Sequence, residues 1–418
     1  MDKEMTAFYK TLAARLTQKE VLDRIGITKR GMHALLAAHR WKERFSQGIF
    51  VDRLHTCTRL LEICRPAMEE LAPPPREGWL PALYQLLIAG IFPQSVEWTM
   101  EEASLPGACL YLETLTVLLE EERGTVPFDP RTDFAFLTPG ELEASHYAGE
   151  YSRFVELFGS QRVVELMRIG REIKPFDTLG HIAGVHYIAM HVGRQIAQAG
   201  LPIDLALLSG AAAGHDIGKF GCRSFETHRI PYLHYYYTDQ WFTSNGMPAI
   251  GHVATNHSTW DLELENLPLE SLVLIYADFR VKRKGSTWEG KEKIGFYTLD
   301  DSFQVILDKL DNVDEAKEQR YRHVYAKLHD FEDYMGQLGV NTDLTSDQLQ
   351  PVERRDLALR DSAQSVETLK YMAIEHNIHL MHKISREISF GNLMEDARSE
   401  TEWKNIRAYL NIFEEYFT

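Results

Sequence analysis

The spacing of apolar residues constrains the fold of this 418-residue chain more than any other feature. Apolar side chains recur every three or four positions over residues 16–26, 32–45, 51–71 and 154–173, and again nearer the C-terminus. That period is typical of helices with one buried face. Strand signals are few: an aromatic-rich segment at 230–238 and a candidate hairpin between Arg280 and Leu299. The sequence therefore predicts an all-α (mainly α) fold.

Segments rich in proline, glycine and turn residues divide the chain. We expect loops at 72–78 and 126–134, and a turn-rich connector from residue 337 onward. These breaks predict three regions: a helical domain at 1–150, a central domain at 151–338 and a helical region at 339–418. The chain stops inside a helical pattern that no glycine or proline closes. That pattern fits either a terminal helix or a fragment of a longer protein.

Charge and cysteine usage exclude several classes of protein. Lys and Arg total 45 against 61 Asp and Glu, a net charge of −16, whereas a general nucleic-acid binder needs a basic surface. None of the four cysteines forms a C-x-x-C pair, so a zinc knuckle or disulfide framework is not expected. The N-terminus lacks a signal peptide, and the most apolar run, 83–92, is too short to span a bilayer. We expect a cytoplasmic protein without membrane association.

The adjacent pair His215-Asp216 lies in the stretch GHDIGK, where a helix of small residues ends. At a helix end, both side chains can turn toward one ion. Imidazole and carboxylate ligands suit divalent Fe, Mn, Zn, Ni or Co better than Ca. Further candidate ligands occur in chain order: His181, His186, His191, His234, His252, His257 and Asp278. Asp278 ends an apolar helix, a costly place for a carboxylate that is neither paired nor ligated.

This ordered series resembles the HD superfamily of metal-dependent phosphohydrolases over about residues 175–285. The resemblance rests on GHDIGK, on HIAGV at 181–185, on the 23-residue spacing of His234 and His257, and on the late Asp278. The pattern is most similar to the binuclear members that include diadenosine tetraphosphate hydrolases. The resemblance implies an HD-type helical bundle, here with helical regions on either side of it. Asn256-His257 stands where the cyclic-dinucleotide phosphodiesterases pair two histidines, which argues against that substrate.

The resemblance also implies a ligand set. His181, His215, Asp216 and Asp278 would hold one metal ion, and His234 and His257 would complete a second site with Asp216 as the bridge. His186 remains an alternative to His181, because its separation of 29 residues from His215 is nearer the usual gap. Whether one or two ions bind stays open.

The activity that the resemblance implies is hydrolysis of a phosphoester or phosphoanhydride bond by metal-activated water. The substrate class is a nucleotide or related phosphorylated small molecule. Asp216 and Lys219 are the expected catalytic residues. Lys219, Arg280, Lys282 and Tyr236 are the expected substrate-binding residues, and the basic segment 282–293 would steer a phosphorylated substrate. The flanking helical regions would shape the pocket or mediate a homo-oligomer.

Two other interpretations belong to different functional classes. One is a catalytically silent HD-fold module that senses a nucleotide or regulates a partner. The other is a DNA-binding regulator, because residues 17–37 resemble a helix-turn-helix, with Gly26 at the turn and Lys29, Arg30 and His33 available to DNA. Residues 17–44 carry seven Lys/Arg against three Asp/Glu. The motif is short and helical hairpins often imitate it, so nucleic acid is the less favoured partner.

Overall fold

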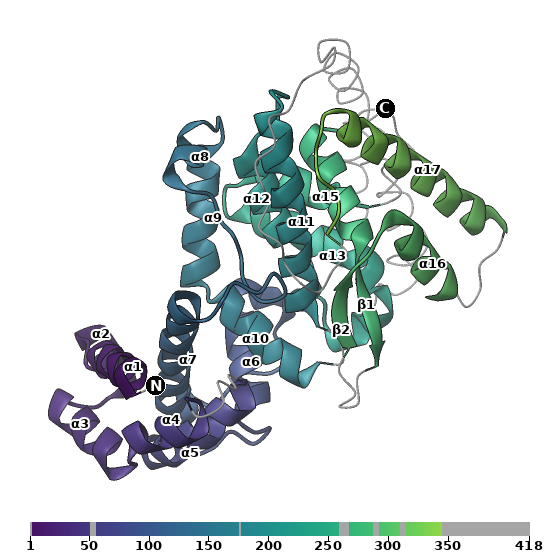
Figure 1. Cartoon of the computed structure of the whole chain (residues 1–418). Coiled ribbons are helices and arrows are strands. Elements are labelled where there is room, and N and C mark those ends of the chain that lie inside the picture. Colours follow the sequence, from purple (N-terminus) through teal and green to yellow (C-terminus); the bar gives the residue numbers. More distant parts are fainter. Residues whose placement is uncertain are drawn as a thin grey trace. The chain divides into compact units, whose positions relative to one another are not determined.

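The structure of the protein, a computed structural model, describes residues 2–50, 56–174, 177–258, 267–286, 292–309 and 315–344. These residues form seventeen α-helices, four short 3-10 helices and one two-stranded sheet (Figure 1). The prediction of an all-α fold is confirmed. Most of the region predicted at 339–418 lies outside the described residues. The described residues group into two compact units, the first comprising 1–129 with 157–179 and the second comprising 130–156 with the residues from 180 onward.

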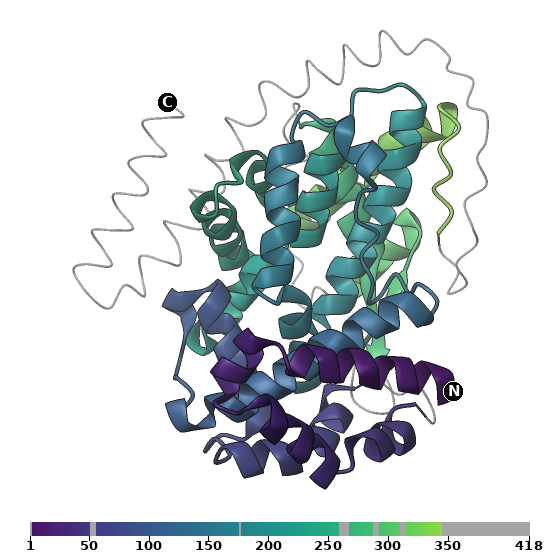
Figure 2. The ribbon, with the colours of Figure 1, turned by 90° about the vertical axis from the view of Figure 1, so that its left-hand side faces the viewer.

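The first unit is built entirely of helices. Its core is aromatic: Phe8 packs against Phe45 and Phe50 with ring centroids 5.0 and 5.1 Å apart, and Trp41 lies 5.7 Å from Phe45. Figure 2 shows α1, drawn in purple and ending at the N label, crossing the other helices of this unit. The helices are α1 (Asp2–Leu16), α2 (Lys19–Ile25), α3 (Lys29–Ala38), α4 (Trp41–Gly48), α5 (Cys57–Leu71), α6 (Trp79–Ile91), η1 (Pro93–Ser95), η2 (Glu102–Ser104), α7 (Leu105–Thr125) and α10 (Val163–Ile173).

A buried carboxylate joins three helices of the first unit and the residue that precedes a fourth. Glu113 on α7 is 1% exposed and accepts hydrogen bonds from Arg15 (2.9 Å), Arg24 (2.6 Å) and Arg162 (2.6 Å). A buried charge is tolerated only when it is paired and hydrogen-bonded. Burial by itself raises the pKa of Glu113, but the three guanidinium groups lower it by more, so the net pKa lies below its ordinary value.

The second unit surrounds a helix of small residues, α12 (Leu205–Gly214), whose residues from Ala206 to Gly214 are all buried. Added Cβ atoms at Gly210 and Gly214 would meet Ile250 at 2.9 Å and Phe242 at 2.5 Å, so glycine is what lets neighbouring helices approach. The other elements are α8 (Pro139–Glu143), η3 (Ile217–Phe220), η4 (Ser224–Arg229), α13 (Ile230–Ser244), α14 (Pro248–Thr255), α15 (Leu269–Arg280), β1 (Val281–Ser286), β2 (Glu292–Phe296), α16 (Leu299–Lys309) and α17 (Glu315–Gln337). The helices α9 (Ala148–Ser160) and α11 (Thr178–Gln198) contribute residues to both units.

The structure corrects two sequence expectations and confirms two others. The aromatic segment 230–238 is not a strand but the start of α13, since Pro231 occupies the first turn and strand propensity depends on packing. The single helix expected at 154–173 is two helices, because Arg162 takes the left-handed conformation (φ 57°) between α9 and α10. The hairpin is confirmed, with Val281 opposite Phe296 in antiparallel register. The expected loops at 72–78 and 126–134 contain no helix or strand.

No helix among the described residues combines the length and the apolar character needed to cross a membrane.

Candidate metal centre

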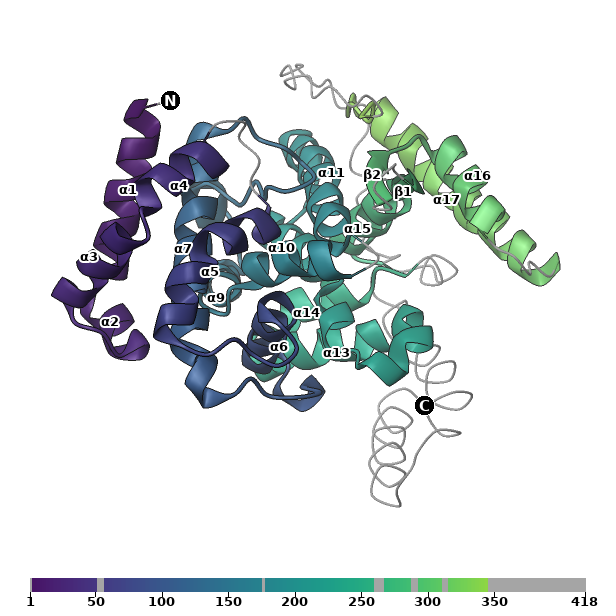
Figure 3. The same ribbon diagram turned by 90° about the horizontal axis from the view of Figure 1, so that it is seen from below.

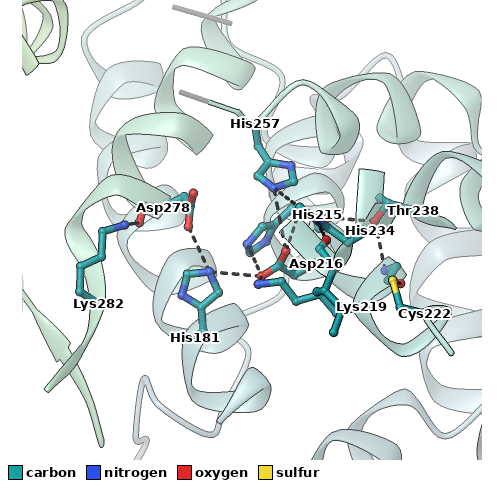
Figure 4. Close-up of polar contacts among 12 residues, drawn as sticks. His181, His215, Asp216, Lys219, Cys222, His234, Thr238, His257, Asp278 and Lys282 are labelled. Atoms are coloured by element: carbon teal, nitrogen blue, oxygen red, sulfur yellow. Dashed lines mark hydrogen bonds and ion pairs between the residues drawn. The ribbon is translucent and has the colours of Figure 1, made fainter. Parts of the chain in front are cut away.

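Six side chains from the helical core of the second unit form a cluster with Asp216 at its centre (Figure 4). His215 is the residue that ends α12, and Asp216 precedes η3, so the small-residue helix delivers both at its C-terminal end. His181 lies in the first turns of α11, His234 on α13 and Asp278 near the end of α15. His257 follows α14 by two residues. The six are His181, His215, Asp216, His234, His257 and Asp278, the full ligand set expected from the sequence.

The two carboxylate oxygens of Asp216 face different histidines. Oδ2 lies 3.3 Å from His181 Nε2 and 3.6 Å from His215 Nε2. Oδ1 lies 3.5 Å from His234 Nε2 and 3.9 Å from His257 Nε2. Asp278 Oδ1 contacts His181 Nε2 at 3.0 Å, on the Oδ2 side. Asp216 is therefore placed so that each of its carboxylate oxygens could be a ligand in a different one of two adjacent metal sites.

Backbone carbonyls fix the tautomer of three of these histidines. The Nδ1–H groups of His215, His234 and His257 donate to the carbonyl oxygens of Ala212 (2.9 Å), Ile230 (2.6 Å) and Ala254 (2.6 Å). A carbonyl oxygen can only accept, so Nδ1 must carry the proton. In the neutral ring, Nε2 then presents a lone pair, the form in which histidine binds metals.

These lone pairs point at one another. The Nε2 atoms of His234 and His257 are 3.4 Å apart, and neither has a proton to share. His215 Nε2 is buried and has no hydrogen-bond partner. A buried acceptor without a donor costs on the order of 1–3 kcal/mol. A cation among these nitrogens and the Asp216 carboxylate would satisfy all of them, so the donor set fits a metal ion.

Burial keeps the three imidazoles neutral. It lowers the pKa of His215 and His257 to about 4 and that of His234 to about 3. For His181, burial also lowers the pKa, but hydrogen bonds to Asp216 and Asp278 outweigh it and leave the net pKa raised. Burial raises the pKa of Asp216, yet Lys219 and the surrounding imidazoles bring it well below its ordinary value. The carboxylate is thus ionised beside three neutral imidazoles, the protonation states in which these groups bind metals.

Gly218 allows α13 to approach the centre. A Cβ at this position would collide with the carbonyl oxygen of His234 and the backbone nitrogen of Thr238. Thr238 then ties the two segments together: its hydroxyl donates to the His215 carbonyl (3.1 Å) and accepts from the Gly218 N–H (3.1 Å). Thr238 was not among the residues expected from the sequence, although it lies four residues after His234 and therefore on the same helix face.

Of the two candidate first histidines, the structure brings His181 to Asp216 and leaves His186 apart from it. His186, five residues further along α11, lies away from Asp216: its Nε2 contacts Ser209 Oγ at 3.0 Å, and its ring packs against Phe134 and Phe136. Burial lowers the pKa of His186 to about 3, so it is a neutral core residue.

Two of the expected substrate-binding lysines lie beside the cluster. The ammonium group of Lys219 forms an ion pair with Asp216 Oδ2. Lys282 Nζ donates to the Asp278 carbonyl at 2.9 Å and contributes to the lowered pKa of the Asp278 carboxyl, whose largest opposing influence is burial. Figure 4 shows the two lysines on opposite sides of His181. Of the basic segment 282–293, the stretch 287–291 lies outside the described residues.

The structure does not bring Arg280 or Tyr236 to the cluster. Arg280 is 1% exposed, and its guanidinium donates to the carbonyl oxygens of Tyr297 (2.7 Å) and Thr342 (2.5 Å). It therefore has a structural role, linking the end of α15 to two later segments of the chain. Tyr236 is exposed and its ring faces Tyr237. The neighbouring Tyr235 packs instead on His234 and His257, with ring centroids 3.9 and 4.7 Å away. Because Tyr235, Tyr236 and Tyr237 are consecutive, the sequence alone does not indicate which of them lies beside the histidines.

Two overlapping groups of these residues can each hold a metal ion. One is His181, His215 and Asp278, and the other is His215, Asp216 and His257; within each group the ligand atoms lie within 4.8 Å of one another. No protein-family model, curated protein or solved structure matches the chain. The chemistry of this centre therefore has to be argued from its own geometry.

Proposed function

We propose that the protein is a metal-dependent phosphohydrolase of the HD type, with a binuclear centre. The observation that carries this proposal is the division of Asp216 between two sets of histidines, each of which includes at least one imidazole whose Nε2 carries no proton. His181, His215 and Asp278 would complete the site at Oδ2, and His234 and His257 the site at Oδ1. Nitrogen and carboxylate ligands favour divalent Fe, Mn, Zn, Ni or Co.

When bound, a pair of such ions lowers the pKa of water and neutralises charge on a phosphoryl group. The chain's own residues supply the rest. The carbonyls of Ala212, Ile230 and Ala254 hold the imidazoles in one tautomer and one orientation. The Lys219 ammonium, on an accessible side chain that is 26% exposed, is placed to bind a phosphoryl oxygen as charge develops on it.

The substrate class in this proposal is a phosphoester or phosphoanhydride of a nucleotide or related small molecule. Lys282 adds positive charge near Asp278, which favours an anionic substrate on that side. The Tyr235 ring, half-buried against His234 and His257, restricts the space beside the second site. Arg280 has no part in this proposal, because it is buried and donates to the carbonyl oxygens of Tyr297 and Thr342.

The test is metal content measured together with turnover. Purified protein should contain about two equivalents of transition metal and hydrolyse p-nitrophenyl phosphate, its bis-ester or a nucleotide panel. His215→Ala should lose both properties. His146→Gln, which changes an exposed histidine of the same unit, should keep both. Metal binding without cleavage of any phosphate would favour the silent nucleotide-sensing module instead. Absence of metal would refute both interpretations.

A further inference from the structure

The first unit contains a helix pair whose dimensions match a DNA-binding motif. The seven-residue α2 ends at Gly26, which has φ 75° and whose N–H bonds to the Leu22 carbonyl at 2.9 Å. Thr28 then caps the ten-residue α3 by accepting a hydrogen bond from the Gly31 N–H at 3.1 Å. The two short helices and the three-residue turn with a left-handed glycine are features that this pair shares with a helix-turn-helix.

Each helix of this pair has buried residues on one face. The helix α2 buries Val21 and Ile25, and α3 buries Met32, Leu35 and Leu36. Each helix thus has one face in the core of the first unit and the opposite face exposed. Figure 3 shows α3 at the outer edge of this unit, away from α5 and α7.

The exposed face of α3 is basic, in a protein that is strongly acidic. Its exposed residues are either positively charged, titratable or small: Lys29, Arg30, His33, Ala34, Ala37 and Ala38. No acidic residue occurs from Gly26 to Lys42, although the whole chain carries a net charge of −16. Within the part of the chain that the structure describes, Lys29 and Arg30 form no ion pair.

We propose that α2 and α3 form a binding element for duplex DNA, with the N-terminal half of α3 entering the major groove. Lys29 and Arg30 would contact phosphates at the mouth of the groove, while the alanines leave room for the helix to approach base edges. Lys42, exposed on α4, would extend the phosphate contacts. Duplex RNA is excluded as the partner in this proposal, since its major groove is too deep and narrow for a helix.

This proposal is independent of the metal centre and concerns the first unit alone. Fluorescence anisotropy of the full chain with a labelled mixed-sequence DNA duplex tests it. At about 50 mM salt we expect binding, with non-specific affinity weakening to a Kd of roughly 10⁻⁴–10⁻⁶ M at physiological salt. With about three phosphates contacted, log K should fall against log salt with a slope of about −3.

Variants identify the surface. The double substitution K29E/R30E should weaken binding at least tenfold and reduce the salt slope by about two. The matched control R65E/R76E makes the same change in charge at exposed arginines elsewhere in the unit and should bind as wild type. Circular dichroism checks that both remain folded, and K29A/R30A, which adds no new charge, should still bind more weakly than wild type.

Three outcomes would overturn the proposal. They are the absence of DNA binding at about 50 mM salt, an equal loss in the control variant, and equal affinity for duplex RNA. The last result would indicate a general polyanion surface in place of a helix seated in the major groove of DNA.

Discussion

Removing metal is expected to lower the thermal stability of the second unit by an amount that can be worked from its ligands. The ligands come from five helices and their ends, so a bound ion joins segments that are far apart in the sequence. The unfolded chain has no such arrangement, and the binding free energy therefore adds to stability. One ion at about one hundred times its Kd contributes about 2.7 kcal/mol.

That contribution converts to a measurable shift in Tm. For a unit of this size, 1 kcal/mol moves Tm by about 2–4 °C. One ion should therefore raise Tm by about 5–11 °C and two ions by roughly twice as much, provided that both are held as tightly. The assay is differential scanning calorimetry of chelator-treated protein, with and without added Mn, Fe, Co, Ni or Zn.

Variants separate the two sites in this assay. The double variant H234Q/H257Q keeps the ligands on the Oδ2 side of Asp216 and should retain about half the shift. Asp216→Asn should lose nearly all of it, and the control His146→Gln should keep all of it. The comparison uses the shift caused by metal, since each substitution also changes the starting Tm. The reasoning is refuted if no ion shifts the wild-type Tm, or if Asp216→Asn responds as wild type does.

Three further predictions follow from particular contacts. Gly218→Ala should destabilise the protein by about 1–3 kcal/mol and reduce metal content, because the new methyl group collides with the backbone of His234. The control Gly336→Ala adds a methyl group where no neighbouring segment lies within 4 Å, and it should stay within about 1 kcal/mol of wild type. Urea titration measures both. Glu113→Gln should cost about 2–4 kcal/mol at pH 7, since three arginines lose a buried partner. The native pKa of Glu113 is lowered, so this difference should be fully present above about pH 5 and shrink as pH falls through the native pKa; a difference that does not depend on pH would contradict the ionic explanation. Lys219→Ala should lower kcat about 10²–10³-fold while metal is retained, and loss of metal in that variant would show that Lys219 acts on the site itself.

The residues that gather at the candidate metal centre could be named from the sequence, because they belong to an ordered pattern that resembles the HD superfamily. The small residues before His215 and the glycine after Asp216 are visible in the chain, and they are what brings α13 close in the structure. The sequence likewise predicted an apolar helix that ends at Asp278, and this helix is α15.

Residues whose environment is set by distant segments could not be predicted. Arg280 has a suitable charge and position in the chain, but its partner Thr342 is 62 residues away. The break between α9 and α10 depends on one left-handed residue, Arg162, that is neither glycine nor asparagine. The helix at 230–238 overrides the strand preference of its aromatic residues because α13 packs on η3 and α14, a contact that local sequence does not encode.

The ion pair between Lys219 and Asp216 has a consequence for the order of events at the centre. Lys219 shares Oδ2 with the site formed by His181 and His215, so its ammonium group and a metal ion compete for the same oxygen. The ammonium group of Lys219 balances charge on the buried Asp216 carboxylate. In the proposed mechanism, Lys219 would become available to a phosphate group only when another cation takes its place on Asp216. In the proposed enzyme, binding of metal would thus both activate water for cleavage and free Lys219 to bind the substrate's phosphate group. Protein from which metal has been removed would bind phosphate poorly.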